Sequence, residues 1–214
     1  MARHTKEEAR ETRERILDAA IQVFHERGVS RPSLSEIANL AGVTRGAIYG
    51  HFRNKADLFN TLCDRIRLPA EALCDDISRR NRDNPLGELR ERWLALFREV
   101  DKNRDWQRIM EIVFHRCELV TESGDIRERM LQGRANGDRQ IRILLDRAVA
   151  VGQLPDTLDT GIAAPMLHAS LVGIIEDWVL QPRDYTLAGS GMRFFDALIT
   201  MLKLGPELSD RAGE

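Results

Sequence analysis

The sequence predicts an all-α protein. Along its 214 residues, stretches in which apolar side chains recur at positions i, i+3, i+4 and i+7 follow one another, and capping residues precede several of them. No stretch shows the alternation of apolar and polar residues that is typical of strands. A chain of this length can form one large or two small domains with a substantial core.

Ser33 and Glu36 open the most informative stretch of the chain. They have the S-x-x-E spacing of a capping box, which predicts a helix that begins at Leu34. Gly42 follows where the chain must turn, because glycine adopts the left-handed conformation at a helix C-terminus without steric penalty. The stretch therefore predicts a short helix and a tight turn.

A second short helix is expected over Arg45–His51, with Thr44 as its cap. Two short helices joined at a glycine are typical of a helix-turn-helix, although they also occur in helical domains with other roles. The outward positions carry groups that read base edges or bind phosphates, which favours DNA binding. These outward residues are Thr44, Arg45, Gly46, Tyr49 and His51.

Further helices are expected on both sides of this motif. One covers Glu8–Arg27 and completes a three-helix head, while residues 1–9 are either a mobile arm near DNA or a terminus without function. Lys55 begins the next helix after the cap Asn54, where free N–H groups favour an anion such as a DNA phosphate. A kink or break is expected in this helix near Pro69.

The remainder of the chain predicts five more helices. We expect a DNA-binding domain over residues 1–54 and a body over residues 55–214. Pro165 should bend the fourth helix of the five or delay its start. The five helices are expected at Leu86–Val100 after the cap Asn84 and Pro85, Trp106–Leu119 after the cap Asp105, Asp125–Val151, Asp159–Leu180 and Ser190–Leu204.

Charge is distributed unevenly along the chain. Residues 1–67 contain 12 Lys and Arg against nine Asp and Glu, whereas the remainder contains 20 against 25. A basic N-terminal head on an acidic body is typical of a small DNA-binding domain attached to a regulatory domain.

Cysteine content and hydropathy indicate a cytoplasmic protein with reduced thiols. Cys63, Cys74 and Cys117 are odd in number and lack C-x-x-C spacing, so we expect neither a disulfide framework nor a zinc site. No apolar run approaches the ~20 residues of a membrane span. The first residues lack the apolar stretch of a signal peptide. We expect no membrane association.

The enzyme motifs that can be tested are absent from the sequence. His115 and Cys117 are the most tempting catalytic pair, but residues i and i+2 of a helix point in different directions. We expect no enzyme activity, no catalytic residue, no metal and no cofactor.

The body carries more apolar surface than a plain core requires. Large adaptable side chains such as Trp93 and Met110 can line a cavity for apolar ligands or form ordinary core. The last two helices are apolar on more than one face, which predicts a second subunit with two-fold symmetry. The expected dimerisation residues are Trp178, Phe194, Phe195, Leu198, Met201 and Leu202.

The segment TRERILDAAIQVFHERGVSRPSLSEIANLAGVTRGAIYGHFRNKADLF resembles the head of the TetR-type transcriptional repressors. MARHTKEEARETR, NPLGELR, EIVFHRCE and GQLPDTLD resemble the AcrR-like and TtgR-like subgroup, which represses multidrug efflux pumps. The resemblance implies a homodimer with a three-helix DNA-binding head and a six-helix body for ligand binding and dimerisation. Lipophilic or aromatic drugs in the body would shift the connecting helix, spread the heads and release a palindromic operator.

The resemblance also implies residue roles. His168 is the polar residue of the implied pocket, or else a hydrogen-bonded core histidine. Gly50 is a departure, because relatives usually have tryptophan in the motif GAIYWHF. The implied DNA face is Ser33, Thr44, Arg45, Gly46, Tyr49, His51 and Lys55. The implied pocket lining is Leu89, Trp93, Leu96, Met110, Val113, Phe114, Ile141, Leu167, His168, Leu171 and Ile175.

Three other functions stay open from the sequence. A regulator of a catabolic or lipid operon would respond to one metabolite rather than to many drugs. An enzyme with an accessory helix-turn-helix would need a polar catalytic cluster, and a scaffold would have a filled core without a cavity.

Overall fold

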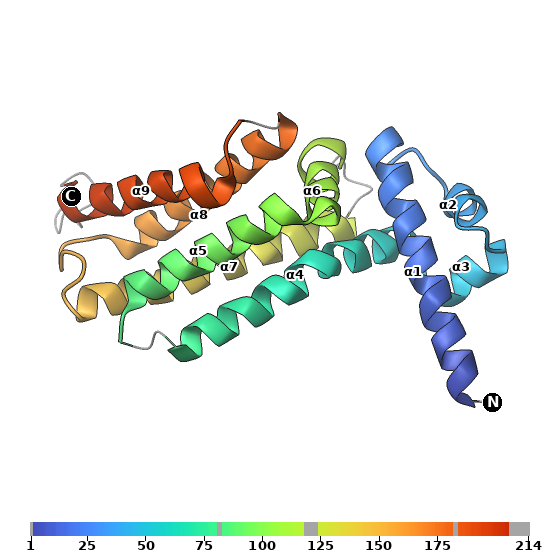
Figure 1. Ribbon diagram of the computed structural model, residues 1–214, viewed down its shortest axis with the longest axis horizontal. Helices are drawn as coiled ribbons and strands as arrows, with labels where there is room; N and C mark the ends of the chain where they lie inside the picture. The colour runs from blue at the N-terminus through green and yellow to red at the C-terminus, as the bar shows by residue number, and fades with distance from the viewer. Residues whose placement is uncertain (1, 81–82, 118–123, 182–183, 206–214) are drawn as a thin grey trace. The chain divides into compact units, whose positions relative to one another are not determined.

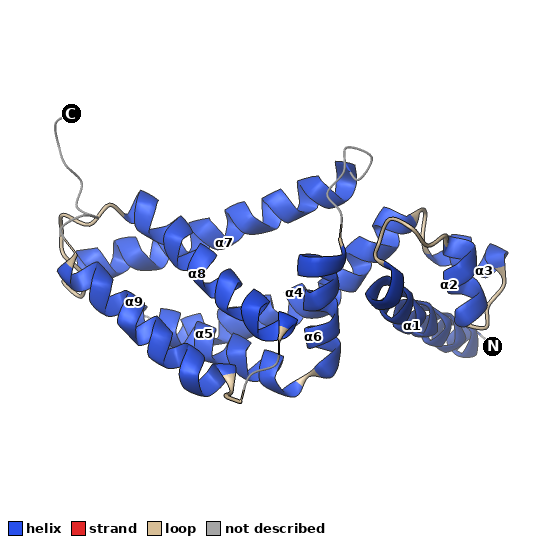
Figure 2. Ribbon diagram, turned by 90° about the horizontal axis from the view of Figure 1, so that it is seen from above, coloured by secondary structure: helices blue, strands red, loops and turns tan. Residues whose placement is uncertain are grey.

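The computed structural model describes residues 2–80, 83–117, 124–181 and 184–205, and within these ranges it contains nine α-helices and no strand (Figures 1 and 2). This confirms the predicted all-α class. The helices are α1 (Ala2–Arg27), α2 (Leu34–Leu40), α3 (Arg45–His51), α4 (Lys55–Arg80), α5 (Pro85–Lys102), α6 (Arg104–Glu111), α7 (Gly124–Ala150), α8 (Thr160–Leu180) and α9 (Met192–Leu204). Two π-helical turns, η1 (Ile112–Arg116) and η3 (Leu187–Gly191), precede α7 and α9.

The chain divides into two compact units. Unit 1 comprises residues 1–68 and 105–130, and unit 2 comprises residues 69–104 and 131–214. α4 and α7 therefore each contribute residues to both units. The domain boundary predicted between residues 54 and 55 stays a prediction.

Capping side chains lie at the start of two helices of unit 2, α5 and α8. The Asn84 side chain accepts a hydrogen bond of 2.9 Å from the backbone N–H of Gly87, and Pro85 follows as the first residue of α5. The Asp159 carboxylate accepts from the N–H of Gly161 at 2.8 Å and opens α8. These side chains satisfy N–H groups that have no partner within the helix.

Two helices are longer than predicted. α1 begins at Ala2 rather than Glu8, because Ala, Lys, Glu and Arg are strong helix formers that continue a helix without an apolar stripe. An ion pair between Glu7 and Arg10 supports this part of α1. α4 runs through Pro69, where a kink or break was expected. The proline donates no N–H, but the hydrogen bonds on either side of it keep the helix continuous.

Two other helices change type at one end. The predicted helix Trp106–Leu119 is α6 followed by η1, and Asp105 lies inside the first turn of α6 rather than at its cap. The predicted end at Leu119 lies outside the described residues. α9 begins at Met192 rather than Ser190, because η3 comes directly before it. A π-helical turn holds more residues than an α-helical turn, and apolar spacing does not report this.

α8 is more apolar than the sequence analysis allowed. It begins at Thr160, so Pro165 does not delay its start. By length and composition it could cross a membrane, which corrects the expectation that no run approaches that length. A single such helix is weak evidence for a membrane span, because core helices meet the same criterion. Only 33% of its apolar window is buried within the chain.

Unit 1 has a continuous apolar core. Phe24 of α1 and Phe59 of α4 meet edge to face with their ring centroids 6.3 Å apart, and Ile37 and Ile48 of α2 and α3 are fully buried in the same cluster. Cys63 packs against this cluster, and burial raises the pKa of its thiol to about 12. The thiol therefore stays protonated at neutral pH and behaves as a small apolar side chain.

Unit 2 is organised around an aromatic cluster. The Trp93 ring lies 4.7 Å from that of Phe195 in α9 and 6.1 Å from that of Phe97, measured between centroids. A side chain at Gly191 would meet the Phe97 ring at 2.8 Å, so the backbone of η3 packs directly on this cluster. The Asp101 carboxylate accepts hydrogen bonds from two backbone N–H groups of η3, which fixes that turn.

Candidate nucleic-acid interface and ligand-binding residues

The predicted capping hydrogen bonds are present in the helix-turn-helix. The N–H of Glu36 donates to the Ser33 hydroxyl at 3.2 Å, and the N–H of Ser33 donates to the Glu36 carboxylate at 2.8 Å, so the capping box is complete. The Thr44 hydroxyl accepts from the N–H of Ala47 at 3.1 Å and caps α3. Gly42 has a φ of +65°, the left-handed conformation that the turn requires.

α3 presents almost its whole surface to solvent. Ile48 is its one buried residue, and Tyr49 is 48% exposed. The Arg45 guanidinium lies 5.7 Å from the centroid of the Tyr49 ring, so these two side chains form one cation–π pair on the outer face. Of the predicted DNA-binding residues, the exposed ones are Ser33, Thr44, Arg45, Gly46 and Tyr49, whereas His51 and Lys55 are partly buried.

Lys55 is held by backbone carbonyl groups. Its ammonium group donates to the carbonyl oxygen of Pro32 at 3.1 Å and to that of Ser30. Burial lowers the pKa of Lys55, and the nearby Glu36 carboxylate opposes this shift. The lysine thus ties the loop before α2 to the first turn of α4. Its contact with a DNA phosphate stays a prediction.

Gly50 weakens α3 without a packing reason. A side chain added at Gly50 would meet no atom within 4 Å, and the residue does not have a positive φ. We therefore expect Gly50→Ala to raise the free energy of unfolding by about 0.5–1 kcal/mol, because glycine costs that much in a helix interior. Urea denaturation followed by circular dichroism measures the change.

The control for this substitution is Gly42→Ala. Gly42 also has open space around it, but its positive φ disfavours alanine. We expect this variant to be less stable than the wild type. A change of the same sign in both variants would contradict our account of Gly50.

The implied ligand-binding residues differ in burial. Met110, Val113 and Phe114 belong to unit 1 and the other eight to unit 2. The partly exposed residues are Leu96, Val113, Phe114 and His168. The buried residues are Leu89, Trp93, Met110, Ile141, Leu167, Leu171 and Ile175. Their role in ligand binding stays a prediction.

His168 has a specific structural partner. Its Nδ1 lies 2.6 Å from the Asp138 carboxylate. A side chain at Gly137 would meet the imidazole Cε1 at 2.5 Å, so the ring packs directly on the backbone of α7. Gly137 therefore serves close packing between α7 and α8, which offsets its cost within a helix.

The predicted dimerisation residues fall into two groups. Phe195 and Leu202 are only 1% and 4% exposed in the single chain, so they belong to its own core and are not available to a partner. Phe194 and Met201 are about half exposed, and Trp178 and Leu198 are partly exposed. Because successive residues of a helix point in different directions, each adjacent pair contributes one side chain to the core and one to the surface.

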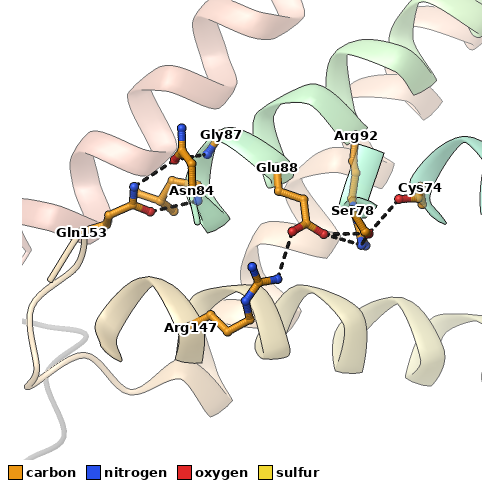
Figure 3. A network of polar contacts seen from close by, with 9 residues as sticks. Cys74, Ser78, Asn84, Gly87, Glu88, Arg92, Arg147 and Gln153 are labelled. Atoms are coloured by element: carbon orange, nitrogen blue, oxygen red, sulfur yellow. Dashed lines mark hydrogen bonds and ion pairs between the residues drawn. The ribbon is translucent and has the colours of Figure 1, made fainter. Parts of the chain in front are cut away.

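A buried ionic cluster in unit 2 was missed by the sequence analysis (Figure 3). Glu88 is 1% exposed and is the one buried charged residue in the described part of the chain. Its carboxylate oxygens lie 2.6 Å from an Arg92 nitrogen, 2.9 Å from an Arg147 nitrogen and 2.8 Å from the Ser78 hydroxyl. The available signal was the Glu-to-Arg spacing of four beside the apolar stripe of Leu89.

Two family models match the chain. One, described as "Bacterial regulatory proteins, tetR family", matches residues 16–62, which contain α2 and α3. The other, described as "MAATS-type transcriptional repressor, C-terminal region", matches residues 84–204, more than half of the chain. The chain belongs to the TetR family.

Relatives of this TetR-family protein match over nearly its whole length. The HTH-type transcriptional regulator TtgR of Pseudomonas putida is 39% identical over 208 residues, covering 97% of this chain and 99% of TtgR. The crystal structure of NalD, described as the secondary repressor of the MexAB-OprM multidrug efflux pump in Pseudomonas aeruginosa, has a TM-score of 0.83 and 33% identity, covering 93% of this chain and 99% of NalD.

A third relative of the TetR-family protein has been solved with a ligand. SmeT, described as the repressor of the Stenotrophomonas maltophilia multidrug efflux pump SmeDEF, is known in complex with triclosan. That structure has a TM-score of 0.79 and 33% identity, covering 95% of this chain and 97% of SmeT. The predicted family is therefore confirmed, and the protein is a transcriptional regulator with a helix-turn-helix.

Proposed function

We propose that this protein is a cytoplasmic, dimeric repressor of a multidrug efflux operon that lipophilic or aromatic compounds release from its operator. The observation that carries the proposal is the capped α3, whose outer face displays Arg45 and Tyr49 while Ile48 alone anchors it. The near full-length similarity to TtgR, NalD and SmeT supports the choice of operon and of ligand class.

The apolar surface of α8 and α9 supports the dimer. Several large side chains on these two helices are about half exposed or more, which is unusual for a surface that stays in water. A palindromic operator needs two recognition helices about 34 Å apart, one turn of DNA, and a two-fold dimer supplies the second helix. The exposed side chains are Ile162, Met166, Leu180, Phe194, Met201 and Leu204.

A footprint on the DNA upstream of its own gene tests the proposal. We expect the protein to protect a palindromic site, and we expect triclosan or other lipophilic drugs to reduce that protection. Protection that no compound of a broad drug panel weakens would contradict the efflux function. Release by one metabolite alone would instead favour a catabolic or lipid operon.

Arg45 and Tyr49 give the corresponding substitutions. We expect Arg45→Ala and Tyr49→Ala each to weaken operator binding by about 1–3 kcal/mol, because each removes a base or phosphate contact. Neither side chain supports the core, so thermal unfolding should change little. Fluorescence anisotropy with a labelled operator measures the affinity, and Arg134→Ala in α7 is the exposed basic control. Normal binding by either variant would remove that residue from the DNA face.

A further inference from the structure

The chain passes between the two units at three points, and each point lies beside an interruption or a weak position of a helix. Pro69 is the first residue of unit 2 within α4, and Gly133 is the third residue of unit 2 within α7. Asn103 ends α5 with extended backbone, at φ −104° and ψ +104°, two residues before the chain returns to unit 1. The unit boundaries therefore coincide with positions where a helix is easy to bend.

Neither Pro69 nor Gly133 serves close packing. Pro69 is exposed and has no N–H to donate to the carbonyl group of the preceding turn. A side chain at Gly133 would meet no atom within 4 Å, whereas one at Gly137 would collide with His168. Proline and glycine both weaken the interior of a helix. α4 and α7 therefore each carry a weakening residue that the packing around it does not explain.

The two helices are also uncovered at these positions. No side chain of residues 70–76 or 131–136 is buried, and all of these residues lie in the described part of the chain. We call these two stretches the uncovered segments. Residues 131–136 are all exposed, and six successive residues include every face of a helix that turns every 3.6 residues. Because packing supplies most of the stability of helices in proteins, the uncovered segments depend on their backbone hydrogen bonds.

Both helices are anchored on either side of the uncovered segments. In α4, Leu62 and Ile77 are buried before and after the segment. In α7, Ile126 and Ile141 are buried in the same way. The Ser78 hydroxyl of α4 also belongs to the buried ionic cluster of unit 2 (Figure 3). Each helix is thus held by packing in both units and is unsupported in between.

We propose that Pro69, Asn103 and Gly133 form a hinge at which the two units change orientation while α4 and α7 stay folded. This inference rests on the proposed function. α3 lies in unit 1, and most of the predicted ligand-binding residues lie in unit 2. Bending an unsupported weak point costs less free energy than bending a packed helix, so the motion that follows drug binding concentrates at the hinge.

A stiff variant and a matched rescue variant test the hinge. Pro69→Ala/Gly133→Ala replaces both weakening residues by the strongest helix former. The rescue variant carries these changes together with Ala72→Gly and Ala135→Gly, at two exposed positions within three residues of the original ones. It restores one glycine to each uncovered segment without adding a side-chain contact.

Hydrogen exchange of the full-length protein, followed by mass spectrometry, is the first measurement. We expect wild-type amides of the uncovered segments to exchange faster than those of residues 141–148, the packed part of α7, because fewer buried contacts oppose local opening. Exchange in the stiff variant should slow by about fivefold or more, the ratio that one glycine-to-alanine change produces in a helix. The rescue variant should return to the wild-type rate.

Release of the operator by triclosan, followed by fluorescence anisotropy, is the second measurement. We expect the stiff variant to bind the operator like the wild type, because neither substitution changes the helix-turn-helix. It should need about fivefold more triclosan for half-release, because the stiffer helices oppose the reorientation that the drug favours. The rescue variant should again resemble the wild type. Gly133→Ala alone is the second variant if the change at Pro69 alters the fold.

The possible failures have different meanings. Uncovered segments that exchange as slowly as residues 141–148 overturn the hinge, whatever happens to DNA binding. Slower exchange in the stiff variant with unchanged release by triclosan also overturns it, because the signal then takes another route. If the wild type binds no upstream DNA, the proposed function is wrong, and the exchange rates alone decide on the hinge. They also decide alone if triclosan does not release the wild type.

Discussion

Replacing Glu88 by alanine will lower the free energy of unfolding by about 3–5 kcal/mol, because removal of one partner leaves buried charges without compensation. The carboxylate contacts Arg92 and Arg147, and Arg92 is itself largely buried. With alanine, two guanidinium groups would face each other and the Ser78 hydroxyl with no anion between them. Urea denaturation at a fixed protein concentration measures the loss, since the stability of the proposed dimer would depend on concentration.

An exposed ion pair in the same unit is the control for Glu88. Arg90 and Asp196 form a bidentate pair between α5 and α9, but both side chains are about half exposed. We expect Asp196→Ala to cost no more than about 1 kcal/mol. If Asp196→Ala costs as much as Glu88→Ala, the burial of the Glu88 cluster does not control its stability.

Trp93→Ala will destabilise the protein by a similar amount, about 3–5 kcal/mol, because it leaves a large cavity in the core. Trp93 is 2% exposed and packs between Phe97 and Phe195. The backbone at Gly191 also packs on Phe97, so little of the surrounding structure can move in to fill the space. The measurement is urea denaturation followed by circular dichroism.

Tyr185→Ala is the aromatic control for Trp93. The Tyr185 side chain is exposed, and its contact with Trp178 uses only its backbone carbonyl. We expect a change within about 0.5 kcal/mol. A loss below about 1 kcal/mol in Trp93→Ala would show that the aromatic cluster can close the cavity. Because alanine disrupts the core, a role of Trp93 in ligand binding is better tested with Trp93→Phe.

Local signals predicted several helix starts. Ser33, Thr44 and Asn84 each cap the helix that follows, as predicted, because capping depends on a side chain and backbone N–H groups within three residues of it. The glycine turn at Gly42 is equally local. The motif and the exposed face of α3 could therefore be predicted from the sequence.

Features that depend on distant residues could not be predicted. Glu88 is paired with Arg147, which lies 59 residues away in sequence. No residue close to Glu88 in the sequence indicates that partner. Phe195 and Leu202 are apolar in the same way as Phe194 and Met201, and only the packing of α9 on α5 decides which of them are buried.

The single anchor of α3 has a consequence for evolution. A seven-residue helix is too short to persist alone in water, so α3 keeps its shape through Ile48 and its caps. Its other side chains contribute almost nothing to the stability of the fold. Under the proposed function, substitutions at these positions would change which operator is recognised while the protein stays folded. A duplicated gene could therefore acquire a new target through few mutations, each passing through a stable intermediate.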